Sequence, residues 1–264
     1  MSANLDQLPQ AQRVLRSPTV VRRRRIGALA LAVLGVSGAF AVLITLQLPG
    51  DMVSETGLTS YQLKMISIAQ AGVLTLMAVA MGHWATPRMG LRAIIVDGDP
   101  PVSTTILLFL VIGAVGGAVF WLIDAALAEQ LTPLGAFQSD KESQLADLEA
   151  FATPIMRLAY GGVTEEILAR YGLMSGLAIA VSIIVKHRST ALGLAIILSS
   201  FIFGLGHLPA IVAFFPDAPS IFLVKTVILN TAIAALFAIV FVQHSLEASM
   251  ASHIGFHLAL VASG

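Results

Sequence analysis

The chain has 264 residues, of which 57% are hydrophobic and only 11% are charged, and its mean hydropathy is +0.88. Soluble domains carry about 25% charged residues, so this composition excludes an ordinary soluble domain and predicts a polytopic membrane protein. The formal net charge of zero gives no reason to expect a nucleic-acid partner. The chain contains no cysteine, which excludes disulfides and thiolate metal sites.

Residues 1–25 are polar and end in four consecutive arginines, Arg22 to Arg25. The apolar stretch that follows, residues 26–48, is longer than the apolar region of a signal peptide and ends at no clear small-residue cleavage site. We therefore expect a basic cytoplasmic N-terminal segment followed by a retained first transmembrane helix.

Six further apolar runs are long enough to cross a hydrocarbon core of about 30 Å at about 1.5 Å per residue. Together with the first, they predict an all-α, polytopic transmembrane helix bundle of about seven to eight spans. The run over residues 153–185 is too long for one perpendicular helix and must tilt, kink or protrude. These six runs cover residues 62–84, 104–128, 153–185, 189–208, 220–242 and 245–262.

The chain thus divides into the basic segment 1–25, a region over 26–150 with three transmembrane helices and an acidic loop, and a helical core over 151–264. The acidic loop, residues 129–152, is expected to hold a short surface helix. No soluble second domain and no fixed-period repeat is apparent.

Lysine and arginine favour the cytoplasmic ends of spans. With the N-terminus inside, the inside segments hold ten of these residues and the outside loops hold only Lys141. We expect an integral protein of the bacterial cytoplasmic membrane with a cytoplasmic N-terminus, and an odd number of spans would place Gly264 outside. Membrane lipid then surrounds the chain, and the sequence leaves the oligomeric state open.

Several charged residues lie within about five residues of predicted span ends. Lys64, Arg157 and Lys225 can extend their charged groups to the interface, a behaviour called snorkelling. Asp124 and His83 are also near span ends, and we expect no functional role for them.

Six other ionisable residues lie inside spans or at the end of one, where an ionised group costs about 2.5 kcal/mol or more near the bilayer centre. They could form a polar clamp between helices, a proton or ion relay, or an active site. Six ionisable groups on three helices are more than a clamp needs, and the spans do not show the paired interrupted helices of many transporters, so we favour an active site. The six are Glu165, Glu166, Arg170, His207, His253 and His257.

Glu166 and Arg170 are four residues apart, so they share a helix face and can form an ion pair. Glu165 is turned by about 100° from Glu166 and can face another helix. A buried carboxylate without a cationic partner suits the role of general base. The spacing therefore predicts one structural and one chemical carboxylate.

The histidines also follow helical spacing. His207 lies four residues after Phe203, and the two glycines between them allow another helix to approach closely. His253 and His257 are four residues apart and could bind a metal together or donate hydrogen bonds to one oxygen.

In order, these residues form EEILAR, FGLGH and HIGFH. They resemble the EExxxR, FxxxH and final Hxxx(Asn/Asp) motifs of the CPBP family of intramembrane proteases, which comprises CAAX proteases and bacteriocin-processing enzymes and is also called the Abi family. The resemblance covers residues 150–264. The chain departs from the pattern at His257, where the family usually has Asn or Asp.

The resemblance implies an endopeptidase that hydrolyses a peptide bond of a membrane-associated peptide or protein in an intramembrane cavity. Glu165 and His207 would activate a water molecule, Glu166 would pair with Arg170, and His253 with His257 would stabilise the oxyanion. A non-catalytic membrane protein of the same fold, acting in binding, immunity or regulation, is the alternative.

The family has been described both as metalloproteases and as glutamate-dependent proteases, and the sequence leaves both readings open. Glu165, His207 and His253 offer nitrogen and oxygen ligands for Zn²⁺ or another divalent metal, with a position left for water. Without a metal, Glu165 would act as base and the histidines as hydrogen-bond donors. Measured from the basic residues Lys186 and Arg188, Glu165 and His207 lie roughly 27–31 Å along their helices, which favours a cavity that opens to the extracytoplasmic face.

Overall fold

The computed structural model describes residues 17–45, 56–98, 103–140 and 154–263. Over these residues the chain is helical and contains no β-strand, which confirms the predicted all-α fold. In chain order the elements are α2 (Pro18–Thr45), α4 (Ser60–Met89), α5 (Ile94–Asp97), α6 (Ser103–Gln130), α7 (Thr132–Asp140), α9 (Pro154–Met156), η2 (Arg157–Glu165), η3 (Ile167–Met174), α10 (Ser175–Ile184), α11 (Arg188–Gly206), α12 (Leu208–Phe214), α13 (Ser220–Gln243) and α14 (Leu246–Ser263).

Six segments in the described part of the chain are long and apolar enough to cross a membrane, rather than the predicted seven or eight. The seventh predicted span forms helix α14, but Glu247, two histidines and several serines make it less apolar than the others. Nine of its 18 residues are buried. Polar side chains are tolerated at membrane depth where they face protein rather than lipid, which explains why α14 departs from the hydropathy pattern. The six segments are Pro18–Ala41, Ser60–Met89, Ile106–Gln130, Pro154–Ile184, Arg188–Phe214 and Ser220–Gln243.

Two predicted segments have different boundaries in the structure. Helix α2 begins at Pro18, so the arginine run lies in its first turns rather than before the helix. Proline fits the first turn of a helix because the N–H that it lacks has no partner there. The acidic loop begins with helix α7, and the rest of the predicted surface helix lies outside the described residues.

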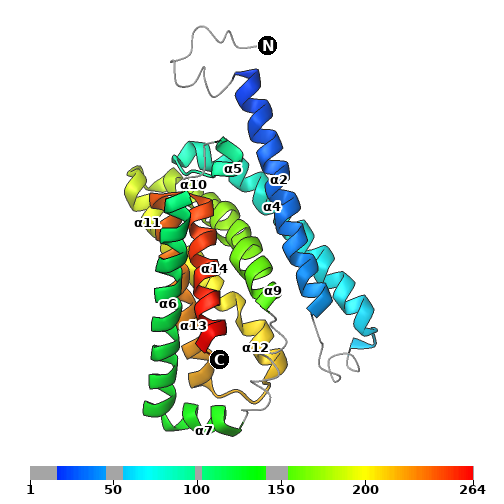
Figure 1. Ribbon diagram of the computed structural model, residues 1–264, viewed down its shortest axis with the longest axis vertical. Coiled ribbons are helices and arrows are strands. Elements are labelled where there is room, and N and C mark those ends of the chain that lie inside the picture. The colour runs from blue at the N-terminus through cyan, green and yellow to red at the C-terminus, as the bar shows by residue number, and fades with distance from the viewer. Residues whose placement is uncertain (1–16, 46–55, 99–102, 141–153, 264) are drawn as a thin grey trace.

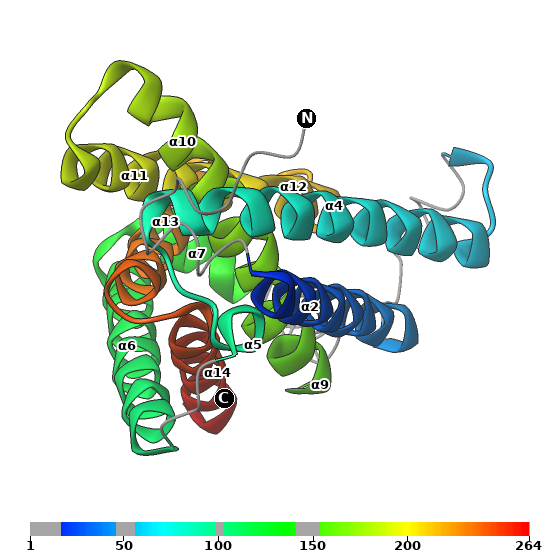
Figure 2. The same cartoon turned by 90° about the horizontal axis from the view of Figure 1, so that it is seen from above.

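The helices have two distinct ends. Figure 1 shows α5 and the turn between α10 and α11 near the end at which α2 begins, whereas α7 and α12 lie at the opposite end. Seen from above, α2 and α4 extend away from the other helices on one side (Figure 2). Arg188 begins α11, and its Nε donates to the carbonyl oxygen of Met89 at 2.8 Å. This side chain to backbone contact joins α11 to the end of α4 at the basic end of the molecule.

Glycines bring α6 and α14 into close backbone contact. A Cβ atom on Gly113 would lie 1.7 Å from the carbonyl oxygen of Ser252, and one on Gly255 would lie 2.0 Å from that of Leu110. These positions leave no room for a side chain, and small residues at such contacts are how membrane helices pack most closely. The contact fixes the position of α14, which carries His253 and His257.

The long run after residue 153 forms one helical segment with a π-helical centre, made of η2 and η3. A π-helix forms hydrogen bonds between residues i and i+5, is rare, and often occurs at functional sites. The irregularity expected in this run thus includes a change of helix type. Glu165 lies in η2, Arg170 lies in η3, and Glu166 lies between the two π-helices.

The structure corrects the expectation of snorkelling for Lys225. Lys225 is only 8% exposed, and its Nζ lies 2.6 Å from Oδ1 of Asp124 on α6. A buried ammonium group requires a counter-charge, so Lys225 pairs across helices instead of reaching the interface. Arg157 is half-buried and lines the cavity described next.

Candidate active site

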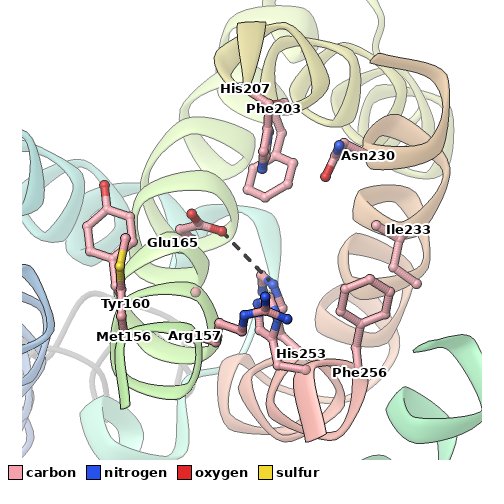
Figure 3. A pocket seen from close by; sticks show the side chains of 12 residues that line it. Met156, Arg157, Tyr160, Glu165, Phe203, His207, Asn230, Ile233, His253 and Phe256 are labelled. Atoms are coloured by element: carbon pink, nitrogen blue, oxygen red, sulfur yellow. Dashed lines mark hydrogen bonds and ion pairs between the residues drawn. The ribbon is translucent and has the colours of Figure 1, made fainter. Parts of the chain in front are cut away.

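A cavity of about 170 Å³ lies among the helices that carry the sequence motifs. Figure 3 shows its lining side chains, with Glu165 on one wall and Asn230 across from it. The lining comes from α9 and η2, from the end of α11, and from α13 and α14. Its residues are Met156, Arg157, Tyr160, Gly161, Glu165, Phe203, His207, Asn230, Ile233, His253, Phe256 and His257.

Glu166 lies outside the cavity in a closed network of polar contacts. Its side chain is fully buried, and its Oε2 lies 3.4 Å from Nε of Arg170, which is also fully buried. Oε1 accepts a hydrogen bond from Nδ1 of His253 at 2.9 Å, and Oε2 accepts one from the hydroxyl of Ser249 at 2.5 Å. The ion pair expected from the i,i+4 spacing is therefore present, and it is extended to α14.

Arg170 contacts an aromatic ring as well as a carboxylate. Its guanidinium carbon lies 5.1 Å from the centre of the Phe203 ring on α11. A guanidinium over an aromatic face is attracted by the ring quadrupole, and the attraction grows when water is excluded. Arg170 thus links its own helix to α11, next to His207.

Glu165 faces the cavity and does not pair with Arg170, which contacts Glu166. Its side chain is 23% exposed, and its Oε2 lies 4.0 Å from Nε2 of His253 (Figure 3). Tyr160, five residues earlier, lines the same cavity, which agrees with the i,i+5 repeat of the π-helix. The two adjacent glutamates therefore occupy different environments, one in the buried network and one in the cavity.

Two glycines before the glutamates bring η2 against α14. A Cβ atom on Gly161 would lie 2.5 Å from Nε2 of His257, and one on Gly162 would lie 2.4 Å from the side chain of Ile254. A larger residue at either position would push the helices apart. The pair of glycines thus sets the distance between the glutamates and the histidines of α14.

His207 is oriented by the backbone of its own helix. It lies between α11 and α12, and its Nδ1 is 2.9 Å from the carbonyl oxygen of Phe203. A carbonyl oxygen only accepts, so Nδ1 carries the hydrogen and Nε2 of the neutral ring is left as an acceptor. His207 therefore offers a basic nitrogen at the cavity.

His253 is held by aromatic rings on both faces. The Phe237 ring stacks on it at 4.5 Å between ring centres, and the His257 ring stacks at 4.8 Å. Since Nδ1 donates to Glu166, the remaining nitrogen, Nε2, points towards Glu165. This leaves Nε2 as the His253 nitrogen that faces the cavity, where an Nε2–H group can donate a hydrogen bond to an oxyanion.

The six residues predicted for the site therefore fall into two groups. Glu165, His207, His253 and His257 line one cavity. Glu166 and Arg170 lie outside the cavity and contact each other, and Glu166 accepts a hydrogen bond from His253. The cavity also includes Tyr160, Asn230 and Arg157, none of which the sequence motifs predict as part of the site. Asn230 had a detectable signal, since it is an amide side chain near the middle of an apolar run.

The predicted metal ligands do not converge on one point. Over the described residues, no three histidine, aspartate or glutamate side chains are placed to hold a metal ion together. Glu165 and His253 approach each other at 4.0 Å, while His207 is oriented separately by Phe203. Within the described residues, this arrangement does not fit the tetrahedral three-ligand site of a catalytic zinc.

The C-terminal part of the chain matches a known protein family. Residues 148–259 match the family model of the type II CAAX prenyl endopeptidase Rce1-like proteins. This match confirms the resemblance to the CPBP proteases, and the Rce1-like region includes all six predicted site residues. No curated protein and no solved structure matches the chain. At family level the match supports a CAAX-type intramembrane endopeptidase, and it assigns no role to single residues.

Proposed function

We propose that the chain is an intramembrane endopeptidase that hydrolyses a peptide bond of a membrane-associated peptide or protein without a metal step. The observation that carries this proposal is the separation of the two adjacent glutamates. Glu166 is held by Arg170, Ser249 and His253, while Glu165 lines a cavity shared with three histidines. Within the described part of the chain, the ion-pair contact of Glu165 is to His253, and a carboxylate next to imidazole groups is suited to general base catalysis.

In the proposed reaction, Glu165 takes a proton from a water molecule while Nε2 of His207 accepts a hydrogen bond from the same water. The water oxygen attacks the carbonyl carbon of the substrate, and the carbonyl oxygen becomes an oxyanion that accepts hydrogen bonds from His253 and His257. Glu165 then returns the proton to the amide nitrogen as the carbon–nitrogen bond breaks. The products are a new carboxyl terminus and a new amine.

Glu166 and Arg170 serve this reaction indirectly. Glu166 accepts a hydrogen bond from Nδ1 of His253, which fixes the orientation of the ring. Arg170 lies 3.4 Å from Glu166 and offsets the cost of burying a carboxylate there. We therefore assign both to positioning His253.

The proposal is tested by exposing the purified protein in detergent to a library of peptides from a protein digest, and by identifying new termini with mass spectrometry. We expect the wild-type protein to generate new termini. His207→Gln, which cannot serve as the same acceptor, is expected to generate them about 10²-fold more slowly. A wild-type protein that yields no new termini contradicts the proposed function, and an unchanged rate in His207→Gln contradicts the role of His207.

We further propose that the N-terminus is cytoplasmic and that the cavity lies towards the extracytoplasmic side. The basic residues of α2 and the α10–α11 turn occupy one end of the molecule (Figure 1), and cytoplasmic segments are enriched in such residues. The cavity residues Arg157 and His207 lie at the ends of their spans distant from that turn. Substrates would then enter from the extracytoplasmic half of the bilayer.

Because the chain has no cysteine, single-cysteine variants report this orientation directly. Ser189 and Ser220 are both exposed and lie at opposite ends of spans, so Ser189→Cys and Ser220→Cys form a matched pair. We expect a membrane-impermeant maleimide to label Ser220→Cys in intact spheroplasts and Ser189→Cys only after permeabilisation. The reverse labelling pattern would contradict this orientation, because it would place the N-terminus outside and the cavity towards the cytoplasm.

A further inference from the structure

Asn230 places an amide side chain in an otherwise apolar stretch of α13. An amide at membrane depth is unfavourable unless it finds hydrogen-bond partners in the protein or in a polar cavity. Asn230 is half-buried and lines the cavity with Glu165 and His207. In Figure 3 it lies across the cavity from Glu165, near Phe203. The amide therefore faces the space in which the proposed reaction takes place.

One hydrogen bond fixes which way the amide points. Nδ2 of Asn230 donates to the carbonyl oxygen of Thr226 at 2.9 Å. That oxygen only accepts, so the contacting atom of Asn230 must be the nitrogen. Oδ1 and the second N–H of Nδ2 are left for a partner, and the structure gives no other hydrogen bond to this side chain among the described residues.

Close packing of α11 against α13 holds Asn230 near His207. A Cβ atom on Gly204 would lie 2.4 Å from Oγ1 of Thr231 and 2.7 Å from the carbonyl oxygen of Val227. The two helices thus meet directly beside Asn230, less than one helical turn before His207. The relative position of the amide and the imidazole is set by backbone contact rather than by flexible side chains.

The chemistry of a carboxamide matches that of a peptide bond. A peptide unit offers one C=O acceptor and one N–H donor, and a carboxamide offers the same two groups. The proposed reaction uses Glu165, His207, His253 and His257 for the water and the oxyanion, and it leaves the backbone next to the scissile bond without an assigned partner. On the basis of the proposed function, we infer that Asn230 binds a backbone peptide unit of the substrate and so positions the scissile bond next to Glu165 and His253.

Asn230→Leu tests this inference, because leucine is similar in size and makes no hydrogen bond. Losing one or two neutral hydrogen bonds to the substrate corresponds to about a 10-fold higher KM. We expect that increase for the best peptide of the library, with kcat changed by less than about 3-fold. Gln243→Leu is the matched control, because it removes an exposed amide at the far end of the same helix, outside the cavity, and we expect its KM to equal that of the wild type.

A binding measurement separates this inference from the proposed function. In Glu165→Gln protein, fluorescence anisotropy of the labelled peptide that wild-type protein binds most tightly gives Kd whether or not the peptide is cleaved. Adding Asn230→Leu is expected to raise that Kd about 10-fold, and Asn230→Ala provides the same comparison if the leucine variant does not fold. An unchanged KM and Kd, or a lower kcat at unchanged KM, overturns the inference. Absence of cleavage by wild-type protein bears on the proposed function alone.

Discussion

Glu165→Gln is expected to lower kcat for peptide hydrolysis by about 10³-fold, with KM changed by less than about 3-fold. Glutamine keeps the shape and hydrogen-bonding capacity of the side chain but cannot take a proton from water. Glu165 is the carboxylate among the cavity-lining residues, because its neighbour Glu166 is fully buried in another network. Initial rates of product formation over a range of peptide concentrations measure both constants.

Glu129→Gln is the matched control for this prediction. Glu129 is an exposed glutamate at the end of α6, outside the cavity, so its substitution should leave both constants unchanged. A Glu165→Gln protein that retains more than about a tenth of the wild-type rate contradicts the assignment of Glu165 as the base.

Arg170→Met is expected to destabilise the folded protein by about 3–5 kcal/mol. Arg170 and Glu166 are both fully buried, and removing the guanidinium leaves a buried carboxylate with only Ser249 and His253 as partners. For a chain of this size, the loss corresponds to a midpoint of thermal unfolding lower by roughly 10 °C. Thermal unfolding in detergent, followed by circular dichroism, measures the shift.

The double variant Glu166→Gln/Arg170→Met separates the ion pair from the packing. Removing both charges ends the cost of an unpaired buried carboxylate, so we expect the double variant to unfold at a higher temperature than Arg170→Met alone. Its peptidase activity should remain low, because His253 has lost its anionic partner. Arg88→Met is the control, since Arg88 is exposed on α4. Arg170→Met as stable as Arg88→Met would contradict a structural role for the ion pair.

The sequence predicts the helices well because burial in lipid leaves a strong and simple signal. Long apolar runs locate the six spans, and spacing alone pairs Glu166 with Arg170. Helix α14 is the exception, since its polar residues face the bundle and weaken the hydropathy pattern. Counting apolar runs includes α14 as a seventh span, but it does not show that the polar side chains of α14 face other helices.

Contacts between helices were harder to predict. Nothing in the local sequence shows that Lys225 meets Asp124 or that Ser249 donates to Glu166, because these partners are distant in the chain. The closeness of η2 to α14 depends on Gly161 and Gly162, whose role becomes visible only when the opposite helix is in place. The motifs predict six of the site residues. Asn230 belongs to no motif, and only the packing of the helices shows that it lines the cavity.

The most direct test of the central claim follows the oxygen of water into the product. Purified protein is incubated in water enriched in oxygen-18 with a peptide of the library, and the products are examined by mass spectrometry. We expect one heavy oxygen atom in the new carboxyl terminus made by the wild-type protein and almost no product from Glu165→Gln. Equal product from both proteins, or no cleavage by the wild type, would contradict hydrolysis at Glu165.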